Sequence, residues 1–88
     1  MKVVVVYKQE SDYARSVLDW LGDFKRQAGK PLEELDPDTR AGSIFCRNYD
    51  IVEYPTIVSL DDSGVVQNMW RGTMLPTISE VSYYVQEN

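Results

Sequence analysis

A continuous apolar run lies near the start of the chain. Residues 2–7 read Lys-Val-Val-Val-Val-Tyr, so the β-branched side chains follow one another without a polar break. An alternating pattern would leave one face of a strand in water, whereas an unbroken apolar run is typical of a strand covered by helices on both sides. The run predicts a central, buried parallel strand over residues 2–7.

The hydrophobic period changes after this run. Apolar side chains then recur at three- and four-residue steps, which place them on one face of a helix. They are Ala14, Val17, Leu18, Leu21, Phe24 and Ala28. The pattern predicts a helix over residues 12–28, with Ser11 as its N-cap and Asp12 in its first turn. Gly29 is expected to end it, because glycine tolerates the left-handed conformation of a C-cap.

A short strand and a second helix are predicted next. Residues 31–35 favour a strand that carries two leucines. Asp36 followed by Pro37 is typical of a helix start, with the acid as N-cap and proline at the first helical position. The helix is predicted over residues 37–48. Its inner face is expected to carry Ala41, Ile44, Phe45 and Asn48 or Tyr49, with the single cysteine, Cys46, off to one side.

The last part of the chain predicts a hairpin and a third helix. Strands are expected over Thr56–Leu60 and 65–71, joined by a turn in which Gly64 adopts a positive φ. Gly72 ends the second of these strands, and a helix follows over residues 77–87. Its inner side chains are expected to be Ile78, Val81, Tyr84 and Val85.

The order of these elements is βαβαββα. Two crossover connections followed by a hairpin predict an α/β fold, a four-stranded mixed sheet of order 2-1-3-4 flanked by three helices. This strand order satisfies the right-handed crossover rule. A chain of 88 residues is expected to form a single domain, residues 1–88.

Charge and composition remove several classes of function. Lys and Arg total 9 against 14 Asp and Glu, so the net charge is −5, and we expect no binding to nucleic acid. The sequence has no histidine, which removes imidazole catalysis and imidazole metal ligands. One cysteine cannot form a disulfide or a four-thiolate zinc site within the chain. No apolar run is long enough to span a membrane, so we expect a cytoplasmic protein without membrane or metal contacts.

A family resemblance rests on one segment and on the motifs that follow it. Residues 49–58 read Tyr-Asp-Ile-Val-Glu-Tyr-Pro-Thr-Ile-Val, and Asp62-Ser63-Gly64 and Arg71-Gly72 follow at the hairpin and after the last strand. With the element order, these motifs resemble the thioredoxin-like superfamily, and most closely a small glutaredoxin that lacks the extra N-terminal strand and helix of thioredoxin. The resemblance implies a cis peptide bond before Pro55, beside the position of the family's active site.

The chain departs from the family at the active-site motif. The Cys-x-x-Cys of the family lies just after the first strand, where this chain reads Ser11-Asp12-Tyr13-Ala14. A dithiol cycle needs a thiolate at a helix N-terminus and a second thiol one turn on, and neither Ser11 nor Ala14 supplies a thiol. No histidine is present to activate the serine. We therefore expect a redox-inactive protein without catalytic residues, rather than an enzyme.

The expected function is binding of a protein or an extended peptide segment. In the family, the backbone beside the cis-proline pairs with an extended substrate, which is a local form of strand addition. The resemblance implies a groove formed by Lys8, Ser11, Asp12, Tyr13, Tyr54, Pro55, Gly72 and Thr73. Tyr7 is either a further aromatic wall of this groove or packing between helix and sheet, and the same choice applies to Tyr13.

Two alternatives stay open. Glutaredoxins carry a lysine three residues before the first cysteine, where it binds a glutathione carboxylate, and Lys8 has that spacing to Ser11. The chain would then be a glutathione-binding or monothiol redox protein in cell redox homeostasis, using Cys46 or a partner's thiol. Without glutathione, no cofactor is expected. In the second alternative, an apolar surface over residues 70–75 forms a homodimer and the groove is vestigial.

Overall fold

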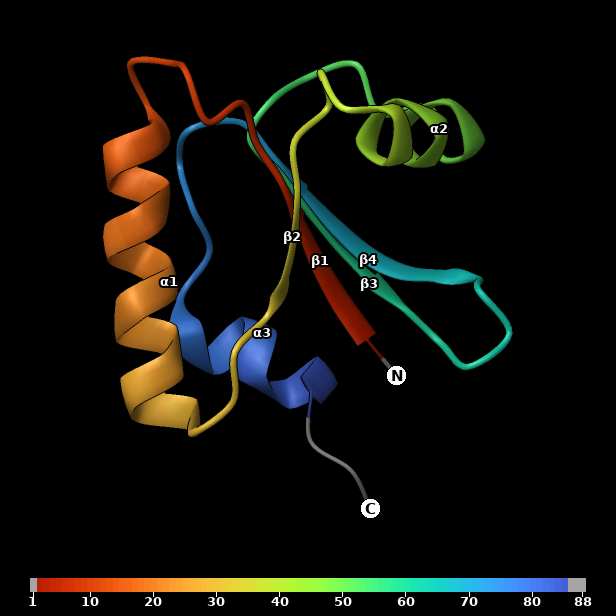
Figure 1. Cartoon of the computed structure of the whole chain (residues 1–88). Helices are drawn as coiled ribbons and strands as arrows, with labels where there is room; N and C mark the ends of the chain where they lie inside the picture. The colour runs from red at the N-terminus through yellow and green to blue at the C-terminus, as the bar shows by residue number, and fades with distance from the viewer. Residues whose placement is uncertain (1, 86–88) are drawn as a thin grey trace.

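The elements follow the predicted order, as Figure 1 shows. The structure is a computed structural model that describes residues 2–85. Its elements are β1 (Lys2–Val6), α1 (Ala14–Ala28), β2 (Glu33–Leu35), α2 (Arg40–Asn48), β3 (Thr56–Leu60), β4 (Val66–Arg71) and α3 (Ile78–Val85). The last two positions of the predicted third helix, 86 and 87, lie outside the described residues.

The four strands form one sheet of the predicted order, β2-β1-β3-β4. β1 pairs with β2 in parallel, whereas the β1–β3 and β3–β4 pairs are antiparallel. The second connection is therefore not the crossover to a parallel strand that the pattern implies. The registers give the reason, because Leu35 at the end of β2 and Thr56 at the start of β3 both lie opposite Val6. α2 thus returns the chain to the end of the sheet that it left, and β3 runs back along β1.

β1 is buried on both faces, which explains why its sequence does not alternate. Val3 and Val5 pack in a cluster with side chains of α1 and α3, and Val4 and Val6 pack in a second cluster with Cys46 of α2. Figure 1 shows the same layers, with α1 and α3 on one side of the sheet and α2 on the other. The unbroken apolar run is thus explained by two cores, one on each side of the central strand.

α1 begins later than predicted. Its first residue is Ala14, and Tyr13 occupies the N-cap position without a side-chain capping hydrogen bond. Ser11 is therefore not the N-cap; its hydroxyl donates to the carbonyl oxygen of Lys8 at 2.6 Å. Asp12 is likewise not in the first turn of the helix, which contains no acidic residue. Ser11 instead belongs to the loop before the helix, where its carbonyl oxygen accepts a hydrogen bond from the Ala14 N–H at 3.3 Å.

The inner face of α1 differs from the prediction at one position. Leu18 is 50 % exposed, although its spacing predicts burial. Trp20, one turn before the fully buried Phe24, packs there instead, with the two ring centroids 5.5 Å apart. The Trp20 indole N–H also donates to the carbonyl oxygen of Pro76 at 2.9 Å, which ties α1 to the segment before α3. Gly29 ends the helix with a φ of 76°, as predicted.

α2 begins three residues later than predicted, because a different residue caps it. Thr39 is the N-cap, and its hydroxyl oxygen accepts a hydrogen bond from the N–H of Gly42 at 3.1 Å. Asp36 is not the N-cap, and Pro37 lies in the turn before the helix. The Asp36 carboxylate instead accepts hydrogen bonds from the N–H groups of Asp38 and Gln9.

The buried face of α2 also differs from the prediction. Ala41 is exposed and Ile44 is 44 % exposed, whereas Cys46, predicted to lie to one side, is 7 % exposed. Phe45 and Tyr49 are half-buried and pack ring against ring, with centroids 4.8 Å apart. The face that meets the sheet therefore carries Cys46, and the only thiol of the chain is buried in the second core.

The hairpin turn and the start of α3 are determined by residues close together in the sequence. Gly64 has a φ of 87°, as predicted. Thr77 and Glu80 form a capping box, in which the Thr77 hydroxyl accepts from the Glu80 N–H and the Glu80 carboxylate accepts from the Thr77 N–H. Val81 is fully buried, and the other predicted inner side chains of α3 pack against the first core.

Within residues 2–85, no helix is long and apolar enough to cross a membrane.

Alkaline pH is expected to weaken the fold through Tyr7. This side chain is 2 % exposed, and its hydroxyl donates to the Glu34 carboxylate at 2.8 Å. Burial, with that hydrogen bond and the nearby negative charge, raises the pKa of Tyr7 to about 12 from 10.0. The folded state thus holds the Tyr7 proton more tightly than the unfolded state does. The resulting contribution to the free energy of unfolding is complete below pH 10. It is lost as pH rises toward 12, by about 2 to 3 kcal/mol.

The measurement is the urea midpoint against pH for wild type and Tyr7→Phe. The variant has no phenol at this position, so its midpoint should fall less steeply over the same pH range. Tyr83→Phe is the control, because Tyr83 is 70 % exposed and its removal should leave the wild-type profile. Parallel profiles for wild type and Tyr7→Phe would contradict the prediction.

Candidate functional site

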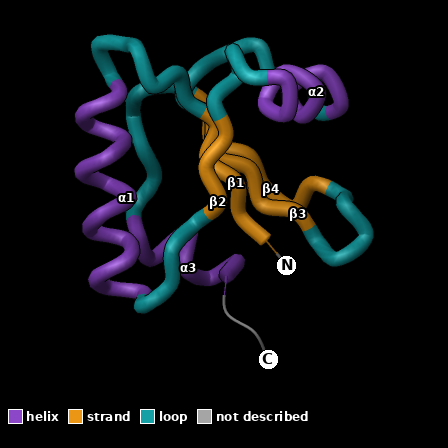
Figure 2. Tube along the Cα trace, viewed as in Figure 1, coloured by secondary structure: helices purple, strands orange, loops and turns teal. Residues whose placement is uncertain are grey.

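Four loops meet at one end of the sheet, where β1 ends and β3 begins. Figure 2 shows these loops in teal, and hydrogen bonds and an ion pair join them. They are the β1–α1 loop, the β2–α2 loop, the α2–β3 loop and the segment after β4. This is where the sequence predicts a binding groove, so the predicted elements place the candidate residues at a common end.

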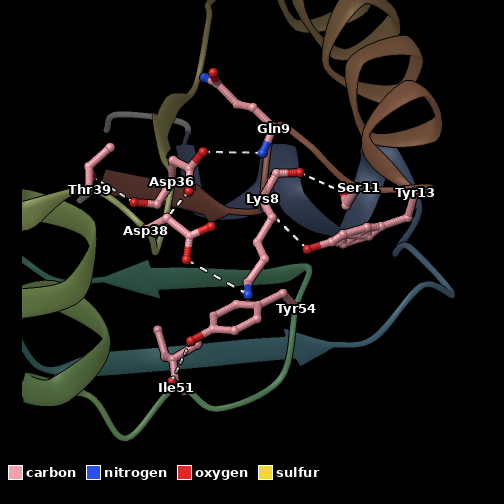
Figure 3. A network of polar contacts seen from close by, with 9 residues as sticks. All are labelled: Lys8, Gln9, Ser11, Tyr13, Asp36, Asp38, Thr39, Ile51 and Tyr54. Carbon is pink, nitrogen blue, oxygen red and sulfur yellow. Dashed lines mark hydrogen bonds and ion pairs between the residues drawn. The ribbon is translucent and has the colours of Figure 1, made fainter.

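Lys8 is the centre of the polar contacts in this region (Figure 3). Its backbone N–H donates to the Tyr13 hydroxyl at 3.1 Å, and its carbonyl oxygen accepts from the Ser11 hydroxyl. Its ammonium group lies 3.7 Å from the Asp38 carboxylate and 5.6 Å from the centre of the Tyr54 ring. The β1–α1 loop is therefore folded on itself and held against the β2–α2 and α2–β3 loops.

Asp36, in the β2–α2 loop, bonds both the β1–α1 loop and its own loop (Figure 3). One carboxylate oxygen accepts from the Gln9 N–H at 3.2 Å, and the other accepts from the Asp38 N–H at 2.8 Å. The backbone carbonyl of Asp36 accepts from the hydroxyl of Thr39, which is the N-cap of α2. One acidic residue thus fixes the position of the β1–α1 loop and of the start of α2.

Pro55 follows Tyr54 of this network in the chain and is bonded to the segment just after β4. The Tyr54–Pro55 peptide bond is cis, as the resemblance implies. The carbonyl oxygen of Pro55 accepts from the N–H of Gly72 at 2.8 Å, so the two segments run side by side. Gly72 has a φ of 95°, and a Cβ there would lie 3.0 Å from the Glu53 carboxylate, so the position requires glycine. Within residues 2–85, the backbone N–H and carbonyl of Tyr54 make no hydrogen bond.

The Tyr54 side chain lies between Lys8 and the buried thiol. Its hydroxyl donates to the carbonyl oxygen of Ile51 at 3.5 Å. Burial raises the pKa of Tyr54, and the neighbouring Cys46 and Asp38 add to this shift. Burial also raises the pKa of the Cys46 thiol, against a smaller opposite effect of its hydrogen bond with Tyr54. At neutral pH both groups hold their protons, and the thiol is covered.

The structure brings most of the predicted groove residues together. Lys8, Ser11, Tyr13 and Tyr54 share one network, and Pro55 and Gly72 are hydrogen-bonded beside it. The side chains of Asp12 and Thr73 are exposed at its edge and form no hydrogen bond or ion pair with another described residue. Tyr7 is not a wall of the groove, because it is buried in the first core.

Sequence reasoning missed Asp36 and Asp38 as members of the site. Both lie in an acidic stretch that predicts a solvated strand end and helix start. A usable signal was the Asp-Pro-Asp-Thr segment, because such residues bond their own backbone in turns. No group of three or more His, Cys, Asp or Glu side chains in the described part of the chain could hold a metal ion.

The comparisons with known proteins bear on the fold. The sequence matches no family model and no curated protein. Among solved structures, the chain is similar to thioredoxin 1 from the thermophilic eubacterium Thermosipho africanus TCF52B, with a TM-score of 0.67 and 15% sequence identity over 97% of this chain and 90% of that one. The chain therefore has a thioredoxin-like fold. With a single cysteine, it has this fold without a Cys-x-x-Cys motif.

Proposed function

We propose that this protein is a redox-inactive thioredoxin-fold module that binds an extended peptide or protein segment. The proposed groove is formed by residues 9–14, Tyr54–Pro55 and Gly72–Thr73. The observation that carries the proposal is the backbone of Tyr54, whose N–H and carbonyl have no partner among the described residues. Unpaired backbone groups next to a strand are the groups that an added extended segment pairs with.

The surroundings of Tyr54 support the same function. Its ring and that of Tyr13 are half-buried, so each presents part of its surface to a ligand. Aromatic side chains are enriched at protein interfaces because they contribute large contact areas with little loss of conformational freedom. The Lys8 ammonium adds one positive charge near the ring. A segment lying along Tyr54 would meet two aromatic rings and a cation.

The state of Cys46 supports redox inactivity. A nucleophilic thiol needs an exposed thiolate, and Cys46 is 7 % exposed with a raised pKa. A free thiol also suits a reducing compartment, so we propose a cytoplasmic location. In an insulin-reduction assay with dithiothreitol, the wild-type protein should run at the background rate. Turnover above background that is lost on Cys46→Ser would refute redox inactivity.

Peptide binding is tested with a ligand selected from a random peptide library. Amide chemical shifts of the labelled protein should change at residues 9–14, Tyr54, Gly72 and Thr73. Tyr54→Ala should weaken binding by about tenfold or more, the usual effect of truncating a buried interface aromatic. Val52→Ala is the matched control, because Val52 is 87 % exposed and should not affect affinity. Shift changes centred elsewhere, an unaffected Tyr54→Ala variant, or a selection without binders would overturn the proposal.

The glutathione alternative is tested in the same experiment. The observation that favours it is the Lys8 ammonium, the basic group that contacts the Tyr54 ring. A glutathione carboxylate would have to compete with Asp38, which lies 3.7 Å from that ammonium. Saturable shifts at Lys8 and Tyr54 on addition of reduced glutathione, lost in Lys8→Gln, would support glutathione as the ligand in place of a peptide.

A further inference from the structure

A hollow of about 220 Å³ lies between β4 and α3 and shares no residue with the groove. Its described lining consists of Asn68, Trp70, Glu80, Tyr83 and Tyr84. Pockets for whole drug-sized ligands are larger, about 300 to 1,000 Å³. The hollow therefore suits one chemical group, not an entire metabolite.

Three aromatic rings form much of this lining. Trp70 and Tyr84 meet at an interplanar angle of 74°, and Tyr83 meets Tyr84 at 86°. At such angles the edge of one ring lies against the face of the other, so the three rings are not stacked parallel to one another. The face of an aromatic ring attracts a cation, most strongly for tryptophan.

One carboxylate completes the lining. Glu80 is the only charged residue among the described lining residues, and its hydrogen bonds from the Thr77 N–H and hydroxyl both use one oxygen, Oε1. The Thr77 N–H and hydroxyl, with a smaller contribution from the Trp70 indole, hold the pKa of Glu80 below its usual value. The carboxylate is thus ionised at neutral pH, and no basic side chain in the described lining neutralises it.

We propose that this hollow binds one organic cation, an alkylammonium or guanidinium group. Three rings and a carboxylate are the combination that recognises such groups, because the rings contact the weakly hydrated surface of the cation while the carboxylate balances its charge. The net charge of −5 attracts cations to the protein as a whole.

The walls of the hollow are held in place before any ligand binds. Trp70 packs against the first core, and the Tyr84 hydroxyl accepts from the Asn68 side-chain amide at 3.2 Å. The capping box fixes Glu80 on the first turn of α3. Little conformational freedom is therefore lost on binding, except at the exposed Tyr83.

The test uses choline and its neutral isostere 3,3-dimethylbutan-1-ol. The full-length labelled protein is titrated with each, following the Trp70 indole N–H and the amides of residues 80–84. Choline should produce saturable shifts, whereas the isostere should not. Acetyl-arginine amide and free arginine are titrated in the same way, to distinguish the two sources of the cation. Tighter binding of acetyl-arginine amide than of free arginine and choline indicates a side chain of a polypeptide. Tighter binding of choline indicates a small alkylammonium molecule.

Two matched variants separate ring and charge. Tyr83→Leu should weaken choline binding by about two- to fivefold, whereas Tyr83→Phe should retain it. Glu80→Gln keeps the capping box, because glutamine serves there as well, and should weaken binding by up to about fivefold. Equal affinity for choline and its isostere, no saturable shifts with any of the cations, or unchanged affinity in both Tyr83→Leu and Glu80→Gln would overturn the proposal. Each outcome is independent of peptide binding at the groove.

Discussion

Replacing Gly42 by alanine is expected to lower the free energy of unfolding by about 3 to 4 kcal/mol. A Cβ at this position would lie 1.8 Å from the carbonyl oxygen of Asp36 and 2.5 Å from its carbonyl carbon. These are backbone atoms, which cannot rotate away as a side chain can. Either the turn before α2 or the helix itself must move. Urea unfolding should show a lower midpoint with an unchanged slope.

Gly22→Ala is the matched control for this substitution. Gly22 lies within α1, and the nearest atom to its added Cβ is the end of the Arg26 side chain, 3.8 Å away. Alanine is favoured over glycine inside a helix, so this variant should gain about 0.5 to 1 kcal/mol. Gly42→Ala should also shift the amide signal of Gln9, whose hydrogen-bond acceptor is Asp36. Similar stability for the two variants would contradict the close contact between α2 and Asp36.

The sequence predicts those elements whose structure depends on local chemistry. The bounds of β3 agree with the prediction, because Thr56–Leu60 is an uninterrupted strand-forming run between Pro55 and a turn. Gly29 and Gly64 have positive φ values, since one is the C-cap of α1 and the other lies in the hairpin turn, where few other residues fit. The strand order also agrees with the prediction, although β3 runs antiparallel to β1 and the second predicted crossover is absent.

The helix starts could not be predicted from local sequence, because distant contacts decide them. Asp36 is a good N-cap by residue type, but its carboxylate bonds the Gln9 N–H, 27 positions away in the sequence. Once Asp36 is engaged, Thr39 caps α2 and the helix begins at Arg40. Ser11 differs from Asp36, because its hydroxyl donates to the carbonyl oxygen of Lys8 within the same loop.

The position of Cys46 was also predicted wrongly from the spacing of apolar residues. The apolar positions of this helix form two overlapping faces, and successive residues are about 100° apart around the axis. The buried face has Cys46 packed with Val4 and Val6 of β1, and Gly42 against the backbone of Asp36, where only glycine fits. This contact is tertiary, and the spacing of apolar residues does not contain it.

The candidate site was predictable only through the family resemblance. Tyr54, Pro55 and Gly72 are separated by up to 18 positions, and only the fold that the resemblance implies places them together. Lys8 was expected in the groove, but its contact with Asp38 was not, because an ion pair between two loops has no sequence period. The hollow between β4 and α3 could not be predicted from the sequence either. The residue type of Trp70 predicts that it packs against other side chains, but its contact with Tyr84 follows from the fold.

Phe24→Ala is expected to destabilise the protein by about 3 to 5 kcal/mol. Phe24 is fully buried in the first core, and its ring stacks on Trp20 with an interplanar angle of 26°. Removing the ring leaves a cavity between α1 and the sheet and frees the Trp20 side chain, which ties α1 to Pro76. For a domain of this size the melting temperature should fall by at least about 12 °C in a calorimetric scan.

Leu18→Ala is the control that makes this result specific to the observed helix face. Apolar spacing alone puts Leu18 and Phe24 on the same inner stripe, so it predicts similar losses for the two truncations. In the structure Leu18 is 50 % exposed, so its truncation should cost less than about 1 kcal/mol. Phe24→Leu keeps part of the apolar volume and should give an intermediate loss even if Phe24→Ala does not fold. A loss for Leu18→Ala as large as that for Phe24→Leu would mean that α1 packs on the sheet through a different face.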